Sequence, residues 1–210
     1  MKNYRSFFLL NSLSLLLVIA LIVYSQLFGP SVSSLFLQPP FSPYPNVALL
    51  THTFQLLCSV PPVVCTFSFA LLKTIQPRHK QNVFILCSAL ITGGFLINEI
   101  FRVHILLGLL AGIPKIAVIL VYAIAAFGYG FAFRRKIQST PYIVLLTGVG
   151  LLAFGIVMDS LHLGDDTIAS LLEGIPKLFS EINITLYFWC VCYKEVLRSF
   201  KRMTAAGYLV

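Results

Sequence analysis

Charged side chains are scarce in this chain. Asp, Glu, Lys and Arg together make up 10% of its 210 residues, whereas a soluble domain carries about 25%. Apolar residues make up 58% of the chain, and the mean hydropathy is +0.91. These values exclude an ordinary soluble domain and predict an integral membrane protein.

Six apolar stretches are long enough to cross the hydrocarbon core of a bilayer, which takes about 20 helical residues. They cover residues 6–27, 47–72, 83–99, 109–133, 142–159 and 172–193. Helices satisfy their backbone hydrogen bonds within the segment, which membrane spans require. We therefore expect an all-α fold, in which residues 1–210 form one polytopic bundle of six transmembrane helices.

Acidic residues are the rarer charged class, with 7 Asp and Glu against 15 Lys and Arg. Twelve of the fifteen basic residues fall on the two termini and on the loops after the second and fourth spans, whereas six of the seven acids fall toward the other side. The positive-inside rule then predicts that both termini are cytoplasmic. The basic excess reflects this topology, so we expect anionic membrane lipids as partners and no nucleic acid.

Signatures of catalysis and of disulfide scaffolds are also missing. The sequence contains no HxxxH motif, and no serine or cysteine has a matching base. All five cysteines lie inside predicted spans, where free Cys is an ordinary buried apolar residue. No disulfide framework is expected.

The tetrapeptide GIPK occurs twice, at residues 112–115 and 174–177. An acid and then a histidine precede each copy: Glu99 and His104 before the first, Asp159 and His162 before the second. Proline is tolerated in the first turn of a helix, so each GIPK is expected to begin one. Because each repeated unit contains two spans, the pattern predicts tandem helical hairpins in parallel orientation.

A double proline, Pro61-Pro62, falls inside the second predicted span. Proline removes the helical donor for the carbonyl one turn earlier, so the carbonyls around Leu57 and Cys58 should be freed and the helix interrupted. A broken helix is typical of a transport site, and proline kinks also occur as packing features.

Polar residues gather toward the side opposite the basic clusters. We expect a polar cavity there that binds or translocates a small molecule, an ion or a lipid headgroup. Its predicted ligand contacts are Glu99, Arg102, Asp159, Lys177 and Glu181.

Glu181 is the deepest of these residues. Glu173, Lys177 and Glu181 are spaced four apart, so they form one stripe along a helix. The Lys177 ammonium can pair with either carboxylate of this stripe. A carboxylate deep in a membrane should be paired, and Lys177 is the nearest partner that the sequence offers to Glu181, with Lys115 and Arg102 as alternatives on other helices.

Two alternatives belong to other functional classes. In an intramembrane metal-dependent hydrolase, His104 and His162, with Asp159 and Glu99, would bind a metal ion and activate water. In an accessory or assembly subunit, the helices would pack against other copies or against partners in a membrane complex. The missing HxxxH motif favours the binding protein over the enzyme, and the sequence identifies no cofactor.

The segments NEIFRVH, GIPK, FRRK and LLEGIPKLFSEINITLYFW, within roughly residues 93–193, resemble an uncharacterised group of bacterial six-span membrane proteins. In that group the third helix ends in an acidic pair followed by His-Glu. Here Asn98-Glu99 stands in place of the acidic pair, and Ile105 follows His104. The resemblance implies the fold and a bacterial plasma-membrane location, but no activity.

Overall fold

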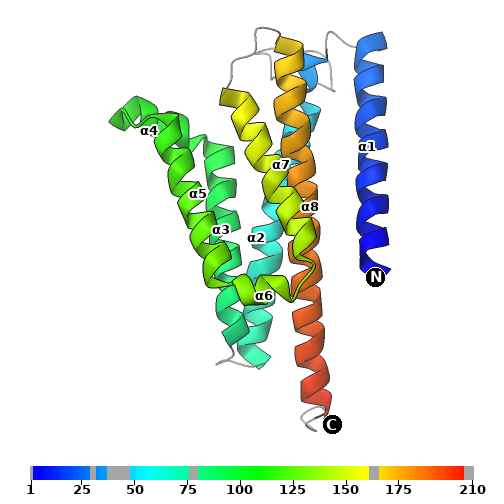
Figure 1. Ribbon diagram of the computed structural model, residues 1–210, viewed down its shortest axis with the longest axis vertical. Coiled ribbons are helices and arrows are strands. Elements are labelled where there is room, and N and C mark those ends of the chain that lie inside the picture. The colour runs from blue at the N-terminus through cyan, green and yellow to red at the C-terminus, as the bar shows by residue number, and fades with distance from the viewer. Residues whose placement is uncertain (1, 29–31, 37–47, 76–79, 161–165, 206–210) are drawn as a thin grey trace. The chain divides into compact units, whose positions relative to one another are not determined.

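The computed structural model describes residues 2–28, 32–36, 48–75, 80–160 and 166–205. Within these ranges the chain forms eight α-helices and one short 3-10 helix, with no strand (Figure 1). The elements are α1 (Lys2–Phe28), η1 (Ser33–Leu35), α2 (Leu49–Ile75), α3 (Lys80–Phe101), α4 (Val103–Ala111), α5 (Lys115–Ala132), α6 (Arg134–Gln138), α7 (Tyr142–Ser160) and α8 (Asp166–Ala205). The predicted all-α class is confirmed.

Five of the helices are long and apolar enough to cross a membrane. Their spans are Arg5–Phe28, Leu49–Ile75, Asn82–Phe101, Lys115–Ala132 and Tyr142–Ser160. The 40-residue helix α8 contains the sixth predicted span, 172–193, but is not among them. Polar residues such as Lys177, Glu181 and Asn183 lower the hydropathy of that segment.

The helices form two compact units. The first unit comprises Met1–Leu57 and Ile143–Leu186. These segments contain the helices α1, η1 and α7, together with the first turns of α2 and the N-terminal half of α8. The second unit comprises Cys58–Tyr142 and Tyr187–Val210, which contain the rest of α2, the helices α3 to α6 and the C-terminal half of α8.

In the first unit, α7 packs closely on α8 through two glycines. A Cβ atom added at Gly148 would lie 2.9 Å from Ile184 Cγ1 and 3.1 Å from the Ser180 carbonyl oxygen. A Cβ atom added at Gly155 would lie 2.8 Å from Lys177 Cγ. Small residues let helix backbones approach closely in membranes, so these glycines set the distance between α7 and α8.

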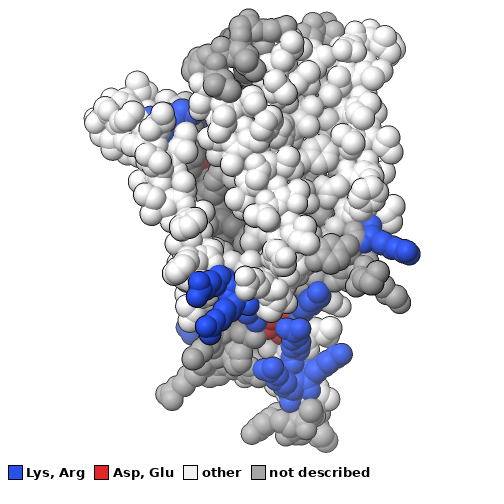
Figure 2. Space-filling view, in the orientation of Figure 1, with Lys and Arg blue, Asp and Glu red and all other residues white. Residues whose placement is uncertain are grey.

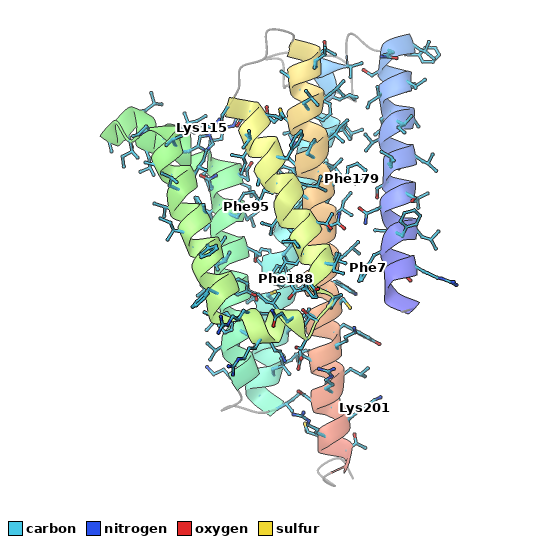
Figure 3. The ribbon with its side chains drawn as sticks, in the orientation of Figure 1. Phe7, Phe95, Lys115, Phe179, Phe188 and Lys201 are labelled. Atoms are coloured by element: carbon cyan, nitrogen blue, oxygen red, sulfur yellow. The ribbon has the colours of Figure 1, made fainter. Side chains whose placement is uncertain are left out.

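A pair of asparagines links α1 to α8. The Asn11 amide donates to Asn183 Oδ1 at 3.1 Å, and the Asn183 amide donates to Asn11 Oδ1 at 3.0 Å. Each amide also donates to a carbonyl one turn earlier in its own helix, that of Phe7 or Phe179 (Figure 3). Only 6% of the most apolar stretch of α1 is buried, so we regard this polar pair as a principal link between the two helices.

Helix α2 remains helical through Pro61 and Pro62, so the predicted interruption is wrong. The predicted freeing of the Leu57 carbonyl is confirmed, because that carbonyl accepts a hydrogen bond from the Thr185 hydroxyl of α8 at 3.3 Å. Membrane helices tolerate proline when a neighbouring helix satisfies the freed carbonyl in this way.

In the second unit, α3 and α5 run side by side (Figure 1) and are joined by tyrosines. The Tyr129 ring stacks on Phe84 with 5.8 Å between centroids, and its hydroxyl hydrogen-bonds to the Ser88 hydroxyl at 2.6 Å. Further along α5, the Tyr122 hydroxyl donates to the Gly94 carbonyl at 3.1 Å. These contacts hold α3 and α5 together at two positions along their length.

The first GIPK segment separates two helices. Helix α4 ends at Ala111, and Gly112 adopts a left-handed conformation with a φ of 65°. The Gly112 N–H donates to the Gly108 carbonyl at 3.1 Å, which is the bond of an αL helix end, and the Ile113 N–H donates to the Leu107 carbonyl at 3.3 Å. Pro114 then caps α5, which begins at Lys115. The predicted span 109–133 is therefore wrong at its start, because the glycine ends one helix before the proline opens the next.

The second GIPK segment does not begin a helix, contrary to the prediction. Helix α8 starts at Asp166 and continues through Gly174 and Pro176. Gly174 serves another purpose here, because a Cβ atom at this position would overlap the ring of Phe36. The same tetrapeptide thus provides a turn in one place and room for a side chain in the other.

Candidate functional site

Lys177 lies at the centre of a charged cluster in the first unit. Its ammonium donates to the Glu173 carboxylate at 2.6 Å, one turn earlier on α8, and lies 3.7 Å from the Asp159 carboxylate on the last turn of α7. The three side chains are between 18% and 36% exposed, so the cluster is partly accessible. We call Asp159, Glu173 and Lys177 the triad.

Helix geometry and one glycine position the triad. Glu173 and Lys177 are four residues apart on α8 and therefore lie on the same face. Gly155 lies one turn before Asp159 on α7, and a Cβ atom there would lie 3.1 Å from the Glu173 carbonyl oxygen. The close helix contact at Gly155 therefore brings the Lys177 side chain alongside α7 and within reach of Asp159.

Polar side chains continue along α8 from the triad into the protein interior. Ser180, Glu181 and Asn183 are 0%, 2% and 6% exposed. The Ser180 hydroxyl oxygen has no hydrogen-bond partner among the described residues. Leaving a buried hydroxyl unpaired destabilises a fold by about 1–3 kcal/mol, so packing alone does not explain a serine here.

The ion pairs of Lys177 agree with the prediction in part. The stripe on α8 offers Glu173 and Glu181 as partners, and Lys177 pairs with Glu173 and also with Asp159 of α7. Helical side chains point toward the N-terminus of their helix, which directs Lys177 toward Glu173 and away from Glu181. Asp159 is supplied by α7, which sequence spacing on α8 does not reveal.

The predicted ligand contacts are divided between the two units. Asp159, Lys177 and Glu181 belong to the first unit, whereas Glu99 and Arg102 belong to the second. Arg102 lies between α3 and α4 with a φ of 48°, which is uncommon for a residue with a side chain. Lys115 is the first residue of α5 in the same unit (Figure 3). Within the first unit, Asp159 and Lys177 are in contact, and the grouping of the whole predicted set stays a prediction.

The proposed metal ligands are not gathered into a cluster in the part of the chain that the structure describes. That part contains no group of three or more His, Cys, Asp or Glu residues that could hold a metal ion. His104 lies on α4 in the second unit, and His162 lies outside the described residues. Their role as metal ligands stays a prediction.

A second charged site, in the second unit, was not predicted from the sequence. Glu195 is 3% exposed and accepts hydrogen bonds from Lys136 of α6 at 2.9 Å and from Arg198 at 3.2 Å. Lys and Arg side chains gather over α6 and the C-terminal part of α8 (Figure 2). The sequence does contain a feature from which this site could have been predicted. Glu195 is the single acid among the predicted cytoplasmic basic clusters, so Lys and Arg side chains that can pair with it are close.

Five helices that are long and apolar enough to cross a membrane define this chain as a multi-pass membrane protein. It belongs to the family described as a domain of unknown function, DUF8692, whose model matches residues 10–192. No curated protein and no solved structure matches the chain. The family match covers most of the chain and names no activity.

Proposed function

We propose that this protein binds a small cation between the triad and the buried part of α8, and carries it across the membrane. The triad and Glu181 together contain three carboxylates and one ammonium. This excess of negative charge favours a cationic ligand. The observation that carries the proposal is the Ser180 hydroxyl, which is fully buried, has no partner among the described residues and directly precedes Glu181.

The pairing within the triad supports the same ligand. The Lys177 ammonium is 2.6 Å from Glu173 but 3.7 Å from Asp159, so the Asp159 pair is the weaker one. A small cation can compete with Lys177 for the Asp159 carboxylate. Buried ionisable residues in membrane helices typically mark ion pathways, and Glu181 fits that pattern because it is 2% exposed.

Replacing Glu181 by Gln should remove cation binding while leaving the protein folded. The test is thermal unfolding of the purified protein in NaCl, KCl or NH₄Cl, compared with N-methylglucamine chloride at equal ionic strength. We expect at least one small cation to stabilise the parent protein, and Glu181→Gln to weaken the apparent affinity by roughly tenfold or more. Cation flux into proteoliposomes should fall in parallel.

Asp166→Asn is the matched control, because it makes the same chemical change at the first residue of α8. It should keep the cation response of the parent protein. Ser180→Ala provides a second variant in case Glu181→Gln destabilises the fold. A full cation response in both Glu181→Gln and Ser180→Ala would remove these residues from a cation site.

We further propose that α8 makes a sixth crossing, so that both termini are cytoplasmic in the plasma membrane of a bacterium. The length of α8 and the distribution of basic residues support this topology. A helical segment precedes GIPK in both copies, as α4 in the first and as the initial turns of α8 in the second. This shared order supports tandem hairpins in parallel orientation.

Reporter tags fused to each end should therefore be found on the cytoplasmic side. Lys115→Cys and Lys177→Cys should both become labelled from the opposite side, above the background of the native thiols, because parallel hairpins place equivalent residues on one side. Tags on opposite sides of the membrane would instead indicate an odd number of crossings.

A further inference from the structure

The junction of α5 and α6 forms an open hollow in the second unit. Its volume is about 390 Å³, and consecutive residues from Phe131 to Lys136 line it. The first three of these residues are apolar and the last three are cationic. The hollow therefore has an apolar side and a positively charged side.

Two of the three cations are available to a ligand. Lys136 is engaged with the buried Glu195 at 2.9 Å, whereas Arg134 and Arg135 are exposed. Neither arginine forms an ion pair with another described residue. The Arg134 guanidinium lies 5.0 Å from the centroid of the Phe131 ring, and this cation–π contact holds it at the apolar side of the hollow.

An exposed apolar strip on α5 leads to the hollow. Ile124, Phe127 and Phe131 are 71%, 78% and 64% exposed. Their spacing of three and four residues places them on one face of α5, and Arg134, the first residue of α6, follows directly beyond the end of α5 with its guanidinium against the Phe131 ring. An apolar strip that ends in two unpaired guanidinium groups is complementary to an amphiphile with an anionic head and a hydrocarbon tail.

We propose that this surface is a specific binding site for an anionic phospholipid. The phosphate oxygens accept hydrogen bonds from Arg134 and Arg135, and an acyl chain lies along Ile124, Phe127 and Phe131. The planar fork of guanidinium donors suits a phosphate group better than a point charge does. Diffuse attraction to anionic membranes requires only positive charge, whereas this site also requires the apolar strip.

The test is lipid binding to the purified full-length protein in detergent, measured by native mass spectrometry. Phosphatidylglycerol and phosphatidylcholine with identical acyl chains are the probes. We expect the parent protein to prefer phosphatidylglycerol, and Arg134→Gln/Arg135→Gln to weaken that binding roughly tenfold or more without changing phosphatidylcholine binding. Both arginines are exposed, so the variant should unfold at the same temperature as the parent.

Lys201→Gln/Arg202→Gln is the control, because it removes the same charge from the exposed last turns of α8 (Figure 3). Its phosphatidylglycerol affinity should stay within about twofold of the parent value. An equal loss in this control would show diffuse electrostatic attraction and overturn the proposal.

The variant Phe131→Ala distinguishes a binding site for a lipid from a binding site for a free anion. It removes apolar contact without changing charge, so phosphatidylglycerol binding should weaken by several fold. Binding that is insensitive to Phe131→Ala, and that inorganic phosphate displaces, would identify a site for free phosphate and overturn the proposal of a lipid.

Discussion

A Gly148→Leu protein should unfold far more readily than the parent protein, because the new side chain has no space between α7 and α8. Even its Cβ atom would lie 2.9 Å from Ile184 Cγ1 and 3.1 Å from the Ser180 carbonyl oxygen. The Ile184 side chain can move, but the carbonyl belongs to the helix backbone, so the two helices must separate. Overpacking typically lowers the free energy of unfolding by about 1–3 kcal/mol, and a whole leucine side chain should reach or exceed the upper value.

Gly150→Leu is the matched control on the same helix. A Cβ atom at Gly150 has no neighbouring atom within 4 Å, and helix propensity favours leucine over glycine. The control should therefore unfold at or slightly above the temperature of the parent protein. Thermal or denaturant unfolding of the purified proteins in detergent measures both effects. Equal stabilities of the two variants would contradict the close contact at Gly148.

Hydropathy predicts four of the spans well because it depends only on local composition. The predicted spans 6–27, 47–72, 83–99 and 142–159 begin and end within three residues of the apolar helical segments of the structure. The span 109–133 fails at its start because it ignores the left-handed Gly112, which ends α4. A long apolar run thus predicts that a segment is buried in lipid, but not that it is one helix.

Tertiary contacts explain why the repeated tetrapeptide GIPK does not begin a helix in both copies. Gly112 needs its missing side chain for a positive φ, whereas Gly174 needs it to accommodate Phe36. Phe36 is distant in the sequence, and nothing in GIPK itself distinguishes the two uses. The sequence therefore predicts where a glycine is required but not for which reason.

The candidate site shows the same limit. The spacing of Glu173, Lys177 and Glu181 predicts a polar stripe on one helix, but the pairing depends on the direction of the lysine and on Asp159 from α7. Pro61 likewise predicts a freed carbonyl at Leu57, and only the packing of α8 supplies Thr185 as its donor. The spacing of residues on one helix can be predicted from the sequence, whereas the residues of other helices that pair with them cannot.

Removing both cations that contact Glu195 should strongly destabilise the second unit. Glu195 is 3% exposed and bonds to Lys136 and Arg198, so Lys136→Met/Arg198→Met would leave a buried carboxylate without these partners. Removing one side of a buried ion pair typically lowers the free energy of unfolding by roughly 3–5 kcal/mol. Lys136→Met alone should account for most of the loss, because Arg198 is 62% exposed and exposed pairs contribute little.

Two further variants distinguish the effect of the unpaired buried carboxylate on stability from the effect of losing positive charge in general. Adding Glu195→Gln to the double variant should restore most of the stability, since neutralising every member of a buried ion pair is often tolerated. Lys201→Met/Arg202→Met removes two exposed cations of α8 and should change the free energy of unfolding by less than about 0.5 kcal/mol. Denaturant unfolding in detergent measures the parent protein and all four variants. If the triple variant were no more stable than the double variant, the loss would come from the packing of the Lys136 and Arg198 side chains, and Glu195 would not need their charge.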